Sequence, residues 1–265
     1  MNISHLTPHA GKHETVIVRV ADNTWHALED DQTVGHGDAI RRPDGRGFIS
    51  VDAWHSTTFE RLAEAMLADL TGPLYTLVDE SDTDSAAVWQ RLGFAIGRRE
   101  REYAVPTDPR VTGLDAARPP SGTTIVPVGE ADEALLHAVD RTIRADVEAT
   151  IGWQTMPAEV LPRPEGVTVV DSSKYAAAAE SERYVGLLRL GPTTRRPRIG
   201  LIAVLADRQR RGVARALLAH TLGALHVAGI GAVSADVDES NAAAIALFEG
   251  IGARRAGGTL ELVSR

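Results

Sequence analysis

Apolar and polar positions follow two different periods along this chain, and these periods predict where its strands and helices lie. Period-two alternation and short β-branched runs between turn formers predict strands near 16–20, 33–41, 47–51, 123–128, 174–178, 183–190, 198–205 and 231–237. Apolar residues spaced three and four apart predict helices over 59–70, 130–143, 212–227 and 241–250. A hairpin around Gly257 and Gly258 is expected to close the chain. The mixture predicts an α/β (α+β) fold.

One part of this pattern occurs twice. The tetrapeptide VDES begins at Val78 and again at Val237, and a helical run follows each copy up to a glycine, Gly93 or Gly252, at a constant offset of 159 residues. This agreement indicates a duplicated domain. Residues 106–121 hold four prolines among turn formers without an apolar period, which is typical of a linker. We therefore expect a first domain over 1–105, a linker over 106–121 and a second domain over 122–265.

Composition narrows the possible classes of protein. The hydrophobic fraction of 43% and the charged fraction of 24% are those of a globular protein. The absence of cysteine excludes disulfides, a thiolate nucleophile and cysteine-bound zinc, and no histidine pair has metal-ligand spacing, so we expect no metal. A net charge of −8 argues against a nucleic-acid partner. Without an apolar run of membrane length or a signal peptide, we expect a cytoplasmic protein with no membrane partner.

The stretch from Arg198 to Leu222 carries the clearest chemical signal. An apolar strand runs into a polar turn and then into a helix opened by Gly212, which gathers free backbone N–H groups and the positive end of a helix dipole. The pattern lacks the GKS or GKT ending of a P-loop, and the other GxG of the chain, Gly229 to Gly231, lies between a helix and a strand, which is the wrong order for a dinucleotide fold. It predicts a site for a pyrophosphate. A solvated basic face is the alternative interpretation of its arginines.

Two motifs in this half resemble the GCN5-related N-acetyltransferase (GNAT) family. The hexapeptide QRRGVA, Gln209–Ala214, matches the family signature of Gln or Arg, two residues, Gly, one residue, and Gly or Ala. A second family pattern is matched by Asn241, Ala244, Leu247, Phe248 and Gly252. The resemblance covers 122–265. With the repeat, it implies two tandem GNAT-like domains, each a mixed, mostly antiparallel sheet flanked by helices, of which the first is a degenerate copy.

The resemblance implies acetyl-CoA as the cosubstrate, admitted where the fourth and fifth strands of the second domain splay apart. The pantetheine arm is expected on the backbone of residues 204–206 and the pyrophosphate on residues 209–215. Asn241 is expected to anchor the arm, although a plain helix N-cap is equally consistent with its position. The complete set of expected contacts is Val204, Leu205, Ala206, Gln209, Arg210, Arg211, Gly212, Val213, Ala214, Arg215, Asn241 and Phe248.

Two departures from the family concern catalysis. Phe248 stands where the family often places the tyrosine that protonates the leaving thiolate, and the fourth strand, residues 198–202, holds no carboxylate to act as base. The candidate catalytic residues are therefore Asp236 and Tyr175, with Asp238 and Tyr184 as further candidates. Each could instead be a surface residue. The backbone N–H near Leu205 is expected to stabilise the oxyanion of the transition state.

The acceptor is expected next to the segment that follows the first helix of the second domain. There Asp146 and Glu148 could attract a cationic amine and Trp153 could form a wall, although an exposed helix face explains the acids equally well. We expect an acetyl-CoA-dependent N-acetyltransferase, an acyltransferase acting on the primary amine of a small molecule such as an antibiotic or metabolite, as a monomer or homodimer. Mycothiol-synthase-like and antibiotic-modifying tandem enzymes look similar. The alternative is a non-catalytic acetyl-CoA-binding regulatory protein.

The first domain is expected to bind no acetyl-CoA. Aligned on the VDES repeat, it lacks about six residues around the predicted anion turn, where VDAWHSTTFERL offers no glycine-rich cradle. We therefore expect one acetyl-CoA per chain, in the second domain.

Overall fold

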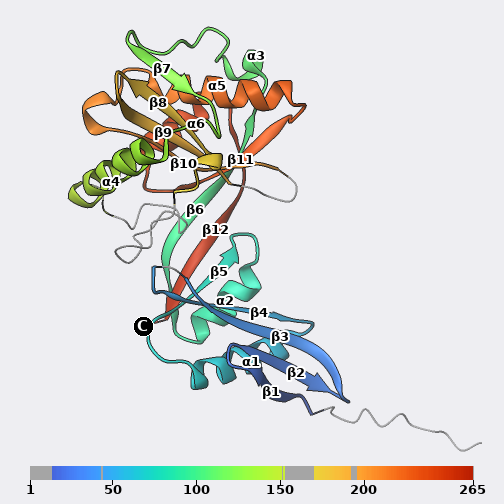
Figure 1. Cartoon of the computed structure of the whole chain (residues 1–265). Coiled ribbons are helices and arrows are strands. Elements are labelled where there is room, and N and C mark those ends of the chain that lie inside the picture. Colours follow the sequence, from blue (N-terminus) through green and yellow to red (C-terminus); the bar gives the residue numbers. More distant parts are fainter. Residues whose placement is uncertain (1–13, 43, 151, 153–169, 192–195, 265) are drawn as a thin grey trace, which may run out of the picture.

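The computed structural model describes residues 14–42, 44–150, 152, 170–191 and 196–264. Figure 1 shows two lobes joined by two long strands, β6 (Phe94–Pro106) and β12 (Arg254–Ser264). The N-terminal lobe contains β1 (Val16–Ala21), β2 (Thr24–Glu29), β3 (Gln32–Arg41), β4 (Gly47–Ala53), α1 (Ser56–Asp69), β5 (Leu74–Asp79) and α2 (Thr83–Arg91). The C-terminal lobe contains α3 (Pro109–Thr112), β7 (Thr123–Val126), α4 (Glu133–Ala149), η3 (Ser172–Lys174), β8 (Tyr175–Glu180), β9 (Arg183–Gly191), β10 (Arg198–Val204), η4 (Ala206–Arg208), α5 (Val213–Val227), β11 (Ala232–Asp238) and α6 (Ala242–Glu249).

All described strands belong to one sheet that runs through both lobes. Its order is β1-β2-β3-β4-β5-β12-β6-β11-β10-β9-β8-β7, so β1 and β7 are the edges. Neighbouring strands are antiparallel except in the pairs β4–β5 and β10–β11, which are parallel. The expected mixed α/β fold with a mostly antiparallel sheet flanked by helices is confirmed.

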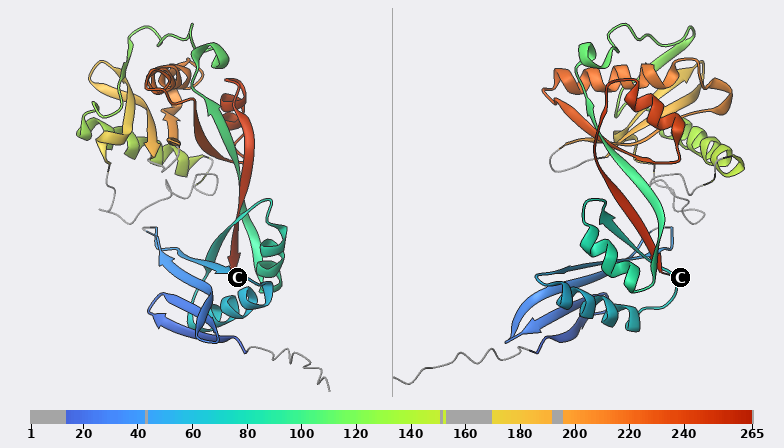
Figure 2. Two further views of the ribbon diagram at one scale, coloured as in Figure 1. Left: turned by 90° about the vertical axis from the view of Figure 1, so that its right-hand side faces the viewer. Right: turned by 180° about the vertical axis from the view of Figure 1, so that it is seen from behind.

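The two lobes exchange their last strands. Strand β6 ends the N-terminal half of the sequence, yet residues 100–106 pair with β11 of the C-terminal lobe. Strand β12 ends the C-terminal half, yet residues 259–263 pair with β5 of the N-terminal lobe. Between these contacts β6 and β12 pair with each other in antiparallel fashion. Figure 2 shows both strands crossing from one lobe to the other. The domain boundaries at 105 and 122 remain predictions, because the sheet does not divide there.

The order of elements from β4 to β6 recurs from β10 to β12. In both series a strand, a helix, a strand parallel to the first, a second helix and a final strand follow one another. Both parallel pairs hold together over only two residue pairs, Gly47–Leu74 and Phe48–Tyr75 in one lobe, Arg198–Ser234 and Ile199–Ala235 in the other. The connection before the first helix differs: residues 54–55 join β4 to α1, whereas residues 205–212 join β10 to α5. The deficit of about six residues that the sequence indicates therefore lies at this turn.

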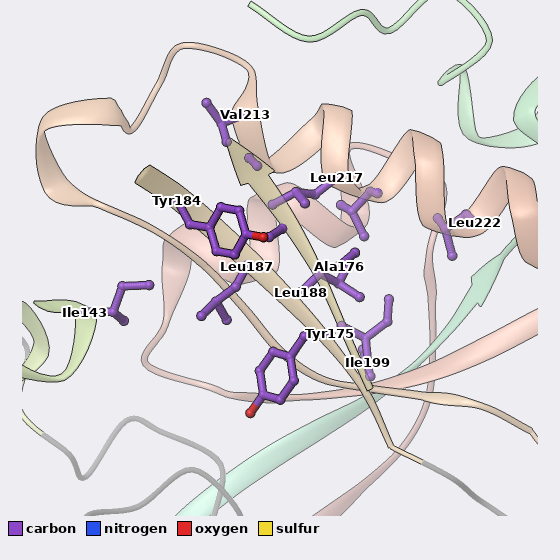
Figure 3. Packing of buried hydrophobic residues seen from close by; sticks show 14 of the residues in the cluster. Ile143, Tyr175, Ala176, Tyr184, Leu187, Leu188, Ile199, Val213, Leu217 and Leu222 are labelled. Carbon is purple, nitrogen blue, oxygen red and sulfur yellow. The ribbon is translucent and has the colours of Figure 1, made fainter. Parts of the chain in front are cut away.

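Each lobe has its own hydrophobic core. In the C-terminal lobe, Leu217 and Leu222 of α5 point towards the sheet, as Figure 3 shows, where they meet Ala176 and Leu188. The spacing i, i+4, i+7 predicts a buried stripe of Leu218, Leu222 and Leu225, of which the first two are almost fully buried and Leu225 is partly buried. The core of the N-terminal lobe is formed by α1 and α2 against their strands, and it also includes Leu260 and Leu262 of β12. The exchanged strand thus completes the core of the lobe that it enters.

The segment predicted as a linker contains the short helix α3, and Thr107, Thr112 and Leu114 are buried where it packs against the C-terminal lobe. One expectation about structure is wrong. The predicted closing hairpin at Gly257 and Gly258 is absent. These glycines instead lie within β12, where the register shifts between Arg255 and Gly257. A Cβ at Gly258 would lie 2.9 Å from the carbonyl oxygen of Glu100, so close strand packing requires glycine there.

Among the described helices, none has the length and apolar character needed to cross a membrane.

The strand exchange predicts that the expected second domain cannot stand alone. A fragment of residues 122–265 lacks β6, leaves β11 and β12 without their common neighbour, and loses Tyr103, Val105 and Leu114 from the core. We expect this fragment to show no cooperative thermal unfolding by circular dichroism, because unpaired strands and a depleted core destabilise it. A fragment of residues 94–265 keeps these contacts and should unfold cooperatively. Cooperative unfolding of the shorter fragment at the full-length melting temperature would contradict this.

Candidate functional site

A cavity of about 830 Å³ lies where β10 ends, between the C-terminal part of α4, the N-terminus of α5 and helix α6. Its volume is in the range of small-molecule and cofactor sites. The residues that line it are Ile143, Asp146, Val147, Ala149, Thr150, Ile202, Ala203, Val204, Ala206, Arg208, Gln209, Arg210, Gly212, Val213, Ala214, Arg215, Asn241, Ala243, Ala244, Ala246 and Leu247.

The cavity opens because β10 and β11 diverge. The two strands pair at Arg198 and Ile199, and a bulge follows between Ile199 and Leu201. From Leu201 to Val204 strand β10 pairs with β9 alone, so its other edge carries backbone groups without a neighbouring strand. The Nε2 of Gln209 donates to the carbonyl oxygen of Val204 at 3.1 Å. An open strand edge of this kind can hold an extended amide chain by main-chain hydrogen bonds.

The N-terminus of α5 forms the polar end of the cavity. Its N-cap, Gly212, has φ +92° and provides no side-chain cap, so the first N–H groups of the helix lack an intrahelical acceptor. The first helical bond runs from Ala216 N to Gly212 O at 3.0 Å. Arg210 also has a positive φ, +61°. Such turns point successive N–H groups to one spot, and together with the helix dipole they form a site for an anion.

The arginines of this turn differ in their partners. Arg208 binds Glu180 at 2.8 Å and Asp207 at 2.6 Å, and the hydrogen bond to Glu180 raises its pKa above the usual value. Within the described part of the chain, Arg210 and Arg215 form no ion pair. Their charges are therefore available to a bound anion, whereas the charge of Arg208 is already compensated by protein carboxylates.

Most of the expected cofactor contacts line this cavity, and three do not. Val204, Ala206, Gln209, Arg210, Gly212, Val213, Ala214, Arg215 and Asn241 all line it. Arg211 is exposed outside it. Leu205 is buried in the core, and its N–H donates to the carbonyl oxygen of Val185 at 2.9 Å. That N–H is occupied by β9, so the expectation that it stabilises an oxyanion is wrong.

Phe248 lies in the core rather than in the cavity. Its ring is 3% exposed and stacks on Tyr103 of β6, with ring centroids 6.2 Å apart. The hydroxyl of Tyr103 donates to Oε1 of Glu249 at 2.9 Å. The preceding residue, Leu247, lines the cavity instead. The expectation that Phe248 contacts the cofactor is therefore wrong, because α6 turns that face towards β6.

The candidate catalytic residues also lie outside the cavity lining. Asp236 forms an ion pair with Arg198, 2.6 Å between Oδ2 and Nη2. Tyr175 and Tyr184 are both 7% exposed and belong to the core, as Figure 3 shows. The hydroxyl of Tyr184 accepts a hydrogen bond from the N–H of Asp132, at the N-cap of α4. Roles of Asp236 and Tyr175 in catalysis remain predictions.

Of the expected substrate residues, one reaches the cavity. Asp146 lines it, with Oδ2 3.5 Å from the N–H of Ala206. Glu148 is exposed on α4 and is not part of the lining. Trp153 lies outside the described residues. Among the described residues, no three histidine, aspartate or glutamate side chains group as metal ligands do.

Sequence reasoning missed the apolar wall of the cavity. Ile143 and Val147 of α4 face Ala243, Ala244 and Ala246 of α6 across it. The run of alanines after Asn241 was a usable signal, because small side chains on one helix leave room for a ligand.

Comparison with known proteins agrees with this geometry. Residues 145–253 match the family model described as "Acetyltransferase (GNAT) family". The "[Ribosomal protein bS18]-alanine N-acetyltransferase" proteins of Escherichia coli (strain K12) and Shigella flexneri are each 49% identical to this chain over 51 residues. These residues are 19% of this chain and 34% of each relative, so the chain matches about a third of the relatives' length.

Solved structures share the fold of both lobes. A GCN5-related N-acetyltransferase from Sphaerobacter thermophilus has a TM-score of 0.62 at 16% identity, over 93% of this chain and 82% of that one. A tandem GNAT protein from the clavulanic acid biosynthesis pathway has a TM-score of 0.63 at 15% identity, over 94% and 83%. At these identities the likeness concerns the fold alone. Residues 145–253, which match the acetyltransferase (GNAT) family model, include all the lining residues of the cavity except Ile143.

Proposed function

We propose that this protein is an acetyl-CoA-dependent N-acetyltransferase whose cosubstrate occupies the cavity of the C-terminal lobe. The observation that carries the proposal is the uncapped N-terminus of α5, which opens into the cavity beside Arg210 and Arg215. The helices α2, α4 and α6 each have an Asp or Asn cap that accepts from one N–H of the first turn, whereas α1, which lies in the other lobe, has no side-chain cap either. Helix α5 leaves its N–H groups to a ligand, and a pyrophosphate has the matching charge and acceptors.

The remaining contacts follow from the shape of the cavity. The open edge of β10 at Ile202–Val204 suits the two amides of the pantetheine arm, which pair with it as an added strand does. The alanines of α6 and the aliphatic residues of α4 give the cavity apolar walls on either side of the arm. Acetyl-CoA supplies a thioester that a neutral amine can attack.

Proton transfer in this site has few protein groups to rely on. Among the described lining residues, Asp146 is the single carboxylate, and no tyrosine or histidine is present. A thiol with a pKa of about 8.5 can leave as the thiolate at neutral pH. A general acid that protonates it therefore raises the rate without being required. General acids typically contribute about 10² to 10⁴ in rate. The lining therefore also favours the alternative, a regulatory protein that binds acetyl-CoA without turnover.

The acceptor that we propose is the primary amine of a small molecule such as an antibiotic or metabolite. The curated relatives carry the name of an alanine N-acetyltransferase of a ribosomal protein, so an N-terminal peptide amine is the rival class. A panel of small amines and of peptides beginning with alanine, read by release of the CoA thiol, separates these classes. Thiol release with small amines supports the proposal. Binding of acetyl-CoA with no release from any amine supports the regulatory alternative.

Gly212 gives the sharpest test of the cofactor site. In a Gly212→Val variant the new side chain enters open space, since no protein atom lies within 4 Å of its Cβ, and there it meets the pyrophosphate. Gly93→Val is a matched control, because Gly93 also has φ +92° and open space, outside the cavity. Both variants carry the same backbone strain, roughly 1–2 kcal/mol.

We expect acetyl-CoA at about 100 times its Kd to stabilise the wild type and the Gly93 variant by about 2.7 kcal/mol. The Gly212 variant should show no such stabilisation by differential scanning fluorimetry. Wild-type affinity in the Gly212 variant would remove the proposed cofactor site.

Calorimetric titration should give one acetyl-CoA per chain. The turn between β4 and α1 consists of Trp54 and His55, which is too short to form the cradle that residues 205–212 form before α5. Two sites of similar affinity would show that the N-terminal lobe also binds the cosubstrate.

Replacing Phe248 with tyrosine should not restore a general acid. The ring lies in the core against Tyr103, so the added hydroxyl is buried and destabilises the fold by about 1–3 kcal/mol. We expect a lower urea midpoint and an unchanged or reduced acetylation rate, with Phe248→Leu as a packing control. A faster Phe248→Tyr enzyme would place that side chain in the active site.

A further inference from the structure

Arg98 of β6 is a buried charge at the junction of the two lobes. Its side chain is 6% exposed, its Nη2 donates to Oε1 of Glu100, and its Nε lies 3.6 Å from Oδ2 of Asp238. The side chain of Asp238 is 7% exposed. Among the described residues the Nε of Arg98 has no hydrogen-bond acceptor, and the carboxylates of Glu100, Asp238 and Glu261 compensate its charge.

Asp238 in turn fixes the turn that leads into α6. Its Oδ1 accepts from the N–H of Ser240 at 2.8 Å and from the Ser240 hydroxyl at 2.5 Å. Its carbonyl oxygen accepts from the N–H of Asn241 at 3.0 Å. Asn241 caps α6 by accepting from the N–H of Ala244 at 3.1 Å, and both residues line the cavity. An unbroken series of contacts therefore runs from Arg98 to the cavity wall.

The repeat supplies a natural comparison. In the N-terminal lobe, Asp79 accepts from the N–H of Ser81 at 2.8 Å and from its hydroxyl at 2.6 Å, and Asp82 caps α2 through Ser85. The backbone contacts also correspond, since Glu80 donates to Gly258 O and Glu239 donates to Arg99 O. The two copies of the repeat are 159 residues apart, so the residue of the second copy that corresponds to Arg98 is Gly257. The turn that borders the cavity thus has a buried arginine where its counterpart has glycine.

We propose that Arg98 is a positioning residue of the acetyl-CoA site. Burying an arginine and an aspartate costs free energy that a well-packed apolar pair does not, so the pair contributes little to stability as such. Its effect is to hold the Asp238 turn, and through it Asn241 and the first turn of α6, at a fixed distance from β10. The residue comes from the strand that links the lobes, so the N-terminal half of the sequence helps to shape the cosubstrate site. This inference rests on the proposed function.

The test compares Asp238→Asn, which keeps the acceptor for Ser240 and removes the charge that faces Arg98, with two controls. Asp79→Asn alters the equivalent turn of the other lobe. Asp44→Asn removes a similarly buried carboxylate, 9% exposed and 2.9 Å from Arg46, in the N-terminal lobe. Arg98→Lys serves as a second variant that retains the positive charge. Each variant is measured by calorimetry with CoA and by KM and kcat for acetyl-CoA.

We expect Asp238→Asn to raise the KM and Kd about tenfold with a small change in kcat, and both controls to stay within about twofold of the wild type. Arg98→Lys should show a smaller rise than Asp238→Asn. An unchanged KM in Asp238→Asn, or an equal rise in Asp44→Asn, would overturn the inference, since the latter reports general destabilisation. Failure of the wild type to bind CoA would instead refute the proposed function.

Discussion

Strand β6 is hydrogen-bonded to β12 along one edge and to β11 along the other, and the rest of the architecture depends on this double pairing. It joins two sheets into one, and it brings Tyr103 and Val105 into the core of the C-terminal lobe. It also gives β11 a partner on the side away from β10. Because β11 is held there, it can diverge from β10 without losing its own backbone hydrogen bonds, and the cavity opens at that divergence.

The electrostatics of the cavity depend on the missing side-chain cap at the N-terminus of α5. An aspartate or asparagine side chain closes the N-termini of α2, α4 and α6, whereas Gly212 at α5 has no side chain to do so. The protein as a whole carries a charge of −8, yet this turn presents Arg210 and Arg215 beside free N–H groups. A local anion site in an acidic protein needs such short-range donors, since the long-range field opposes an anion.

Structural features that depend on residues close in the sequence could be predicted from it. Features that depend on contacts between distant segments could not. Three features are local, so spacing and residue type were sufficient to predict them. They are the helix opened by Gly212, the cap that Asn241 forms on α6, and the polar turn between β10 and α5. The exchange of β6 and β12 could not be predicted, because the periodicity of a strand does not specify its neighbour. Phe248 was misplaced for a related reason: which face of α6 meets the cavity depends on how β6 packs beneath it. The N–H of Leu205 was misassigned because its acceptor, Val185, lies on another strand.

The position of β12 has a consequence for how the protein is made. On the ribosome β12 emerges after every other described element, yet it pairs with β5 and fills the N-terminal core with Leu260 and Leu262. Until then one edge of β5 has no partner, and the apolar face that will receive those leucines stays open to solvent. Synthesis at about 5–20 residues per second separates β5 from β12 by roughly ten seconds or more. The lobe that is translated first is thus completed last. During that interval the nascent chain exposes an unpaired strand edge, which other chains can pair with in aggregation and which chaperones can bind.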